Sequence, residues 1–213
     1  MRVEQISFEE WGTELPKSGF EVFHLPEALS VIADHLDAQC RLYAAKKGQE
    51  TVGLLPLFIE ERHIGRAVLS PPPGLSIPRL GPLLMPNSPK LRKREQLNQA
   101  LIEGVLEDVG ADSSTTLFRM LTPLDYTDPR PLSWNGLDLD PKFTYVVDTA
   151  DASSLDSLMR GFSKSLRNKM GRLPEMDVRI RDEGPDGAVR IHEDVAERYL
   201  EQDKTPPVNR RFV

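Results

Sequence analysis

Two spacings of apolar residues recur along the chain, and together they predict a mixed α/β fold. Alternation of apolar and polar residues, or a short apolar run, predicts strands at 2–6, 41–45, 51–59, 66–70, 115–121, 143–148 and 176–181. Apolar residues three and four positions apart predict helices that begin at Ser7, Pro26 and Ser88, and further helices over 154–173 and 188–203.

The helix starts are marked by capping residues. Ser7 and Glu10 form a capping-box pattern, and Pro26 suits the first position of a helix. Ser88 followed by Pro89 predicts the start of the longest helix, which Gly110 ends. Its buried face is predicted to carry apolar residues at steps of four: Leu97, Leu101, Val105 and Val109.

Proline is unevenly distributed. The chain has 18 prolines among 213 residues, and seven of them lie between residues 71 and 89. A segment with so few N–H donors cannot be a helix or a central strand. We therefore expect 71–89 to form an ordered surface loop with extended pieces, and 123–141 to form a second long loop.

Charge and cysteine content exclude several classes of protein. The formal net charge is −6, which does not indicate bulk nucleic-acid binding. The single cysteine, Cys40, excludes an internal disulfide and is predicted to be a core residue; the four histidines have no metal-ligand spacing. The chain has no apolar run long enough for a membrane span and begins without the apolar core of a signal peptide, so a cytoplasmic location is expected. Gly-rich dinucleotide and Walker loops do not occur in the sequence.

The predicted order up to residue 121 resembles the core of the GNAT acyltransferase superfamily: strand, two helices, three strands, long helix, strand. The hairpin at 41–59 with Gly53 is similar to the second and third strands of that core. Phe162-Ser163-Lys164-Ser165-Leu166-Arg167-Asn168-Lys169 resembles a helix of FemAB-like proteins, which carry two GNAT-like repeats; Ser70–Gly74, Arg130–Trp134 and Phe143–Asp148 fit the same group. The resemblance implies a GNAT-like repeat over 1–150, a connecting basic helix over 151–175, and the start of an incomplete second repeat over 176–213.

The segment between the fourth strand and the long helix departs from the family. GNAT enzymes bind the pyrophosphate of CoA there with an Arg/Gln-x-x-Gly-x-Gly/Ala loop, whereas this chain has its proline-rich segment. Proline lacks the N–H group that a backbone anion site requires. We therefore expect a truncated or naturally incomplete homologue without the cofactor-binding half. Acetyl-CoA or another acyl donor is implied by the resemblance only, and no metal is expected.

Aromatic and basic residues supply the candidate substrate site. Arg130 and the aromatic residues Tyr126, Trp134, Phe143 and Tyr145 are predicted either to line a substrate groove or to anchor a long loop. Lys164 and Arg167, on the basic helix, either bind phosphates of a nucleotide-linked substrate or form a solvated face that pairs with the acidic last helix.

The sequence supports only general predictions for two further sets of residues. The cations Lys90, Arg92, Lys93 and Arg94 at the start of the long helix fit either a bound anion or ordinary solvation. Asp148 and Glu175 are alternative general bases, and the pattern does not choose between them.

The function predicted from the resemblance is N-acyl transfer, acetyl or aminoacyl, to a small-molecule or nucleotide-linked amine. In such chemistry the enzyme mainly positions the amine and stabilises the oxyanion. Two alternatives stay open: a non-catalytic GNAT-like binding or interaction module, and a phosphate-ligand binder that uses the basic helix.

Overall fold

The computed structural model of the chain describes residues 1–36, 38–147, 149, 154–176, 181–206, 208 and 210–212. It divides into two compact units. The first unit contains Met1–Leu139 and His192–Val213, and the second contains Asp140–Ile191. The domain boundaries expected from the sequence remain predictions.

A mixed six-stranded sheet forms the centre of the first unit. Its main path runs β1-β2-β3-β4-β6, and β5 pairs with β3 beside that path. Neighbouring strands are antiparallel except β4 and β6, which are parallel. The bounds are β1 (Arg2–Ile6), β2 (Gln39–Lys47), β3 (Glu50–Glu61), β4 (Arg66–Ser70), β5 (Leu83–Leu84) and β6 (Thr116–Met120).

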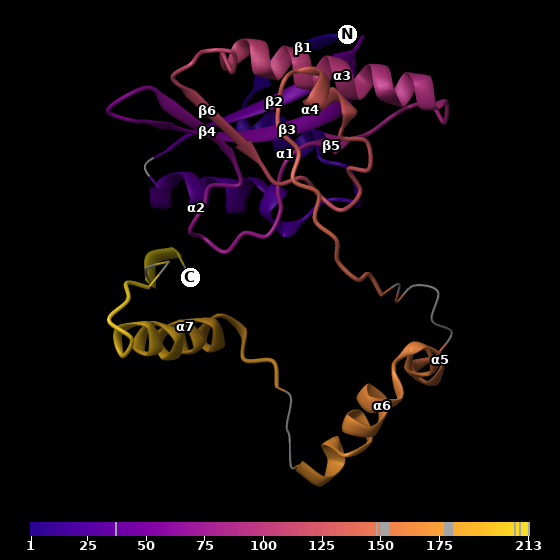
Figure 1. The fold of residues 1–213 in the computed structure, drawn as a ribbon, viewed down its shortest axis with the longest axis vertical. Helices are drawn as coiled ribbons and strands as arrows, with labels where there is room; N and C mark the ends of the chain where they lie inside the picture. Colours follow the sequence, from indigo (N-terminus) through magenta and orange to yellow (C-terminus); the bar gives the residue numbers. More distant parts are fainter. Residues whose placement is uncertain are drawn as a thin grey trace. The chain divides into compact units, whose positions relative to one another are not determined.

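Helices cover both faces of this sheet (Figure 1). One face packs on α1 (Phe8–Glu14) and α2 (Pro26–Leu36), and the other packs on α3 (Leu91–Asp108). The unit also contains α4 (Arg130–Trp134) and the 3-10 turns η1 (Val22–His24) and η3 (Arg210–Phe212). The mixed α/β class is confirmed, and the order β1-α1-α2-β2-β3-β4-α3-β6 is the order that the GNAT resemblance implied, with β5 added.

The local start of α1 agrees with the sequence, whereas the start of α3 does not. Ser7 and Glu10 form the complete capping box, and α2 begins at Pro26. The prediction that α3 begins at Ser88 is wrong: the helix begins at Leu91 after the N-cap residue Lys90. The Ser88 hydroxyl instead accepts a hydrogen bond from the Lys90 N–H at 3.4 Å, so it forms a local turn before the helix.

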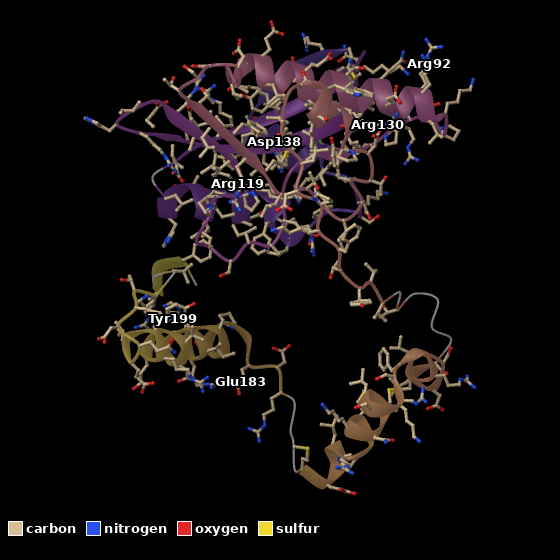
Figure 2. The ribbon with its side chains drawn as sticks, in the orientation of Figure 1. Arg92, Arg119, Arg130, Asp138, Glu183 and Tyr199 are labelled. Atoms are coloured by element: carbon tan, nitrogen blue, oxygen red, sulfur yellow. The ribbon has the colours of Figure 1, made fainter. Side chains whose placement is uncertain are left out.

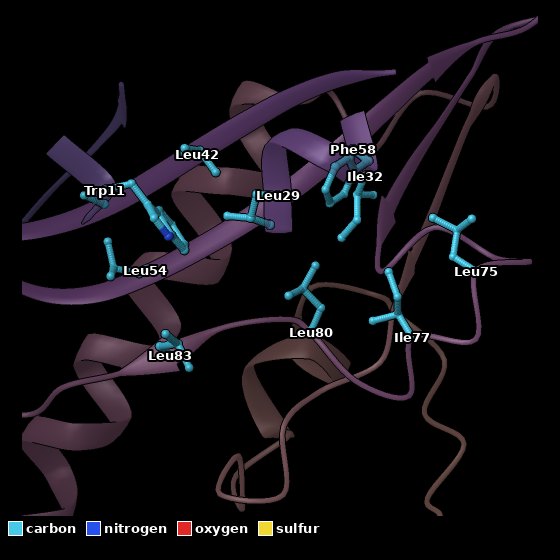
Figure 3. Close-up of a cluster of buried hydrophobic side chains, with 11 residues drawn as sticks. Trp11, Leu29, Ile32, Leu42, Leu54, Phe58, Leu75, Ile77, Leu80 and Leu83 are labelled. Atoms are coloured by element: carbon cyan, nitrogen blue, oxygen red, sulfur yellow. The ribbon is translucent and has the colours of Figure 1, made fainter. Parts of the chain in front are cut away.

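The proline-rich segment is part of the core. Its apolar side chains pack against α1, α2 and the sheet (Figure 3), and the buried ones are Leu75, Ile77, Leu80 and Leu83. The prediction of a surface loop is therefore wrong for these residues, which include the short strand β5. Burial is tolerated because each proline removes an N–H group that would need a partner away from water.

Gly81 joins this segment to three other parts of the fold. Its N–H donates to the Ser70 hydroxyl at 2.9 Å, at the end of β4. Its carbonyl accepts from Nε2 of the buried His24 at 3.3 Å, and the adjacent Leu80 N–H donates to the Leu121 carbonyl at 3.0 Å, just after β6. Gly81 has a φ of +74°, a conformation that favours glycine.

Replacing Gly81 with alanine tests this junction. A Cβ there would lie 3.1 Å from Thr122 Cα, whereas a Cβ at Gly19, which has a similar φ of +83°, would meet nothing within 4 Å. We expect Gly81→Ala to lower the free energy of unfolding by about 2–4 kcal/mol through backbone strain and overpacking, and Gly19→Ala by about 1–2 kcal/mol through strain alone. Urea unfolding of both variants measures the difference, and equal losses would contradict the packing role.

His24 makes the stability depend on pH. Burial lowers its pKa from the ordinary 6.5, opposed by the Gly81 and Glu21 carbonyls and the Glu21 charge. The folded state therefore binds fewer protons than the unfolded state, so stability is complete above about pH 6.5 and falls as the pH drops towards the folded pKa. Urea midpoints at about pH 7.5 and pH 5 should differ more for the natural chain than for His24→Gln, which keeps a side-chain donor. An unchanged difference would contradict this assignment.

The second unit contains short helices instead of the predicted long one. They are α5 (Leu155–Gly161), α6 (Lys164–Gly171) and the 3-10 turn η2 (Leu173–Met176). The predicted continuous helix over 154–173 is wrong because Phe162 is extended and the Ser163 hydroxyl accepts from the Leu166 N–H at 3.2 Å. A serine in this position caps a new helix.

The sequence also predicts two strands and a last helix after residue 142, and the structure differs from each prediction where it describes the residues. Residues 143–147 are exposed and form no strand, and Asp148 lies outside the described residues. Of the strand predicted at 176–181, residues 177–180 lie outside the described residues and Met176 belongs to η2. The last helix, α7 (Gly184–Leu200), begins before 188, with Pro185 next to its first residue.

Candidate functional site

A pocket of about 460 Å³ opens in the first unit beside α3. Its walls come from the turn after α1, the end of the proline-rich segment, the first two turns of α3 and the loop after β6. Because β4 and β6 are parallel, the segments that leave their C-terminal ends start at the same edge of the sheet. Both of these segments reach the pocket.

Asn98 and Tyr126 form a buried polar contact in the pocket wall. Asn98 is 1% exposed and Tyr126 is 8% exposed. The Tyr126 hydroxyl donates to Asn98 Oδ1 at 2.9 Å, and Asn98 Nδ2 donates to the Asp128 carbonyl at 2.8 Å. Burial raises the pKa of Tyr126 to about 12. The phenol is therefore neutral near pH 7, and its contact with Asn98 joins α3 to the loop after β6.

Arg130, a predicted substrate-binding residue, lines the pocket but is already bound by two carboxylates. Its guanidinium donates to both oxygens of Asp128, at 2.7 and 2.8 Å, and to Glu95 at 2.7 Å. Its Cζ also lies 5.3 Å from the centre of the Trp134 ring. Hydrogen bonds from Arg130 lower the pKa of Asp128. Figure 2 shows Arg130 on the first unit, where these contacts attach the start of α4 to α3.

The five predicted substrate-binding residues are divided between the units. Arg130 and Trp134 lie together on α4, although Trp134 is half-exposed and does not line the pocket. Tyr145, Lys164 and Arg167 belong to the second unit, where all three side chains are exposed. The structure therefore brings only Arg130 and Trp134 together, and only Arg130 of the five lines the pocket.

Arg167 has a local structural role. Its guanidinium donates to the carbonyls of Arg160, at 3.1 Å, and Phe162, at 2.7 Å, where α5 ends. Lys164 lies in the first turn of α6. Phosphate binding by these two residues stays a prediction, as does a general base at Glu175, which is exposed in η2; Asp148 lies outside the described residues.

Sequence reasoning missed Glu95, Asn98, Asp125 and Asp128. One signal was available for Asn98, because it lies three, four and seven positions before Leu101, Ile102 and Val105 on the buried side of α3. A polar residue on an apolar stripe needs a buried hydrogen-bond partner, and Tyr126 provides it.

The segment between β4 and α3 does not fit a pyrophosphate-binding loop. The N–H groups of Leu80, Gly81 and Met85 donate to Leu121, Ser70 and Val52, and the prolines have none. These three N–H groups are therefore not available to a pyrophosphate. Burial raises the pKa of Cys40 to about 12, which leaves a neutral thiol, and the side chain is partly buried against the core.

Two further observations apply to the described part of the chain. It contains no group of three potential metal ligands. None of its helices has the length and apolar character of a membrane span.

No family model and no curated protein matches the chain. Solved structures with a similar arrangement include a probable acetyltransferase, with 13% identity over 71% of this chain and 99% of that one and a TM-score of 0.43. A ribosomal-protein-alanine N-acetyltransferase from Brucella melitensis biovar Abortus 2308 has 12% identity over 70% of this chain and 99% of its own, with a TM-score of 0.40. The aminoglycoside antibiotic 6'-N-acetyltransferase from Acinetobacter haemolyticus has 13% identity, covers 71% and 100%, and has a TM-score of 0.36. The fold described above rests on the chain's own element order and strand pairing.

A double-mutant cycle tests the contact between Asn98 and Tyr126. Asn98→Leu leaves the buried Tyr126 hydroxyl without its acceptor and should cost about 1–3 kcal/mol of unfolding free energy. Tyr126→Phe should cost about 1 kcal/mol, and the double variant should cost less than the sum of the two because no phenol is left unpaired. Chemical unfolding of the three variants gives the coupling energy. Strict additivity would show that the contact does not stabilise the pocket wall.

Proposed function

We propose that the first unit is the amine-binding part of a GNAT-like N-acyltransferase, and that the acyl donor binds outside the segment between β4 and α3. The observation that carries this proposal is that N–H groups of that segment are already hydrogen-bonded to other parts of the protein. Its donors at Leu80 and Gly81 are hydrogen-bonded inside the core, whereas the pocket at the start of α3 is open to a ligand. The order of elements supports the GNAT-like part of the proposal.

The charges of the pocket suit a ligand that carries an ammonium group. Three carboxylates line it, from Glu95, Asp125 and Asp128, and the cations are Arg94 and Arg130. The lining therefore has a surplus of one negative charge. Small-molecule sites combine apolar walls with a few placed polar groups, and a volume of about 460 Å³ lies within their usual range of about 300–1,000 Å³.

The finer parts of the proposal follow the FemAB-like resemblance. We propose a tandem arrangement in which a second GNAT-like repeat holds the acyl donor, acetyl or aminoacyl, and the first repeat positions a small-molecule or nucleotide-linked amine. Positioning alone gives large rate effects when two reactants are held in contact. The exposed Lys164 and Arg167 are proposed to meet phosphates if the substrate carries them.

Titration with acetyl-CoA tests where the donor binds. Because the N–H groups of Leu80, Gly81 and Met85 are hydrogen-bonded within the protein, we expect calorimetry on this chain to show no saturable heat up to about 1 mM acetyl-CoA. Micromolar binding that Arg94→Gln abolishes would contradict the proposal. A second outcome would agree with the proposal: weak binding that Arg94→Gln leaves unchanged and the double variant Lys164→Gln/Arg167→Gln removes. It would assign the phosphates of acetyl-CoA to the second unit.

The non-catalytic binding module remains the second candidate function. It is favoured by the chemistry of the pocket, where Tyr126 is neutral near pH 7 and the carboxylates of Asp128 and Glu95 are held by Arg130. A transfer assay with acetyl-CoA and a primary amine separates the two. Turnover that depends on pocket residues supports the enzyme, and amine binding without turnover supports the module.

A further inference from the structure

The charged residues of the pocket fall into two groups. Arg130, Asp128 and Glu95 are tied to one another by the short hydrogen bonds described above. Arg94 and Asp125 are exposed, and neither side chain makes a hydrogen bond or ion pair within the part of the chain that the structure describes. The pocket therefore offers one cation and one anion that no protein group neutralises.

These two charges come from different elements. Arg94 lies in the first turn of α3, and Asp125 lies in the loop after β6. The buried Asn98–Tyr126 contact joins the same two segments, because Asn98 is one turn beyond Arg94 and Tyr126 follows Asp125. The backbone beneath each charge is thus held in place by a hydrogen bond within the protein, which limits the freedom that a ligand would have to remove.

We propose that the pocket binds a zwitterionic ligand of the α-amino acid class, with its carboxylate on Arg94 and its ammonium on Asp125. A guanidinium fork matches a carboxylate, and the N-terminal end of α3 favours the same negative group. Leu83, Met85 and Leu97 line the remaining wall and suit a short aliphatic side chain.

This inference rests on the proposed function in one respect only, namely that the ammonium nitrogen is the acyl acceptor. Binding of the zwitterion is a separate property and is measured without acyl transfer. The two proposals therefore have different tests.

Three compounds of nearly equal size test the two charges. Norleucine carries both groups, pentylamine lacks the carboxylate, and hexanoate lacks the ammonium. Titrated into the full chain and followed by ¹H–¹⁵N spectra, norleucine should bind with a dissociation constant of about 1 mM and at least about tenfold more tightly than either analogue. The amide of the pocket residue Gly19 should shift, and the indole of the buried Trp11 is the internal control.

Single substitutions assign each charge. Arg94→Gln should weaken norleucine and hexanoate about fivefold or more and leave pentylamine unchanged. Asp125→Asn should weaken norleucine and pentylamine and leave hexanoate unchanged. The matched control is Arg92→Gln, since Arg92 is exposed on the same turn of α3 (Figure 2) but does not line the pocket.

Two results would overturn the inference. One is pentylamine or hexanoate binding as tightly as norleucine, which would remove the requirement for both charges. The other is no shift at Gly19 with any of the three compounds while the spectrum stays that of a folded chain. Either result, together with no detectable binding of acetyl-CoA, does not contradict the proposed function. Micromolar binding of acetyl-CoA that is lost in Arg94→Gln contradicts the proposed function and not the zwitterion site.

Discussion

The first unit depends on the attachment of the proline-rich segment at Gly81. Both backbone groups of this residue are hydrogen-bonded, to Ser70 and to the buried His24, and the apolar neighbours Leu80 and Leu83 enter the core on either side. A chain segment can cross an apolar layer only if its polar groups find partners or are absent. The polar groups of Gly81 have partners, and the prolines have no N–H group that needs one. The same segment then forms β5 and one wall of the pocket, so the hydrogen bonds of Gly81 hold both the core and the pocket wall in place.

The sequence predicted most elements of the first unit, including the short strands β1 and β4 with their exact bounds and the start of α2 at Pro26. The clearest signals were a long period or a complete cap. α3, β2 and β3 repeat their apolar spacing over many residues, and Ser7 with Glu10 closes a capping box whose partners are three residues apart. Serine alone was ambiguous. Ser88 precedes a proline and makes only a local turn, whereas Ser163, inside an apolar repeat, caps a new helix. The hydroxyl accepts an N–H in both cases, and the backbone that follows decides between them.

The candidate site was less accessible to sequence reasoning because its parts are distant along the chain. Arg130 was identified from its aromatic neighbours, but its partner Glu95 lies 35 positions earlier on another element. Asp125 has no local pattern at all. Asn98 was detectable in principle as a polar position on the apolar stripe of α3, since burial obliges an amide to find a partner. The spacing of apolar residues in α3 does not show which loop supplies that partner.

The core position of the proline-rich segment also limits where the proposed acyl donor could bind. An N–H group that is committed to a buried acceptor is not free for phosphate. Releasing Leu80 and Gly81 would leave the Leu121 carbonyl and the Ser70 hydroxyl unpaired, at about 1–3 kcal/mol each, and would expose apolar side chains. A phosphate could therefore not use the N–H groups of Leu80 and Gly81, and its attraction to the side-chain cations near α3 is weakened by salt. The same bonds that stabilise the pocket wall are therefore what supports the proposal of a donor site elsewhere and an acceptor in the pocket.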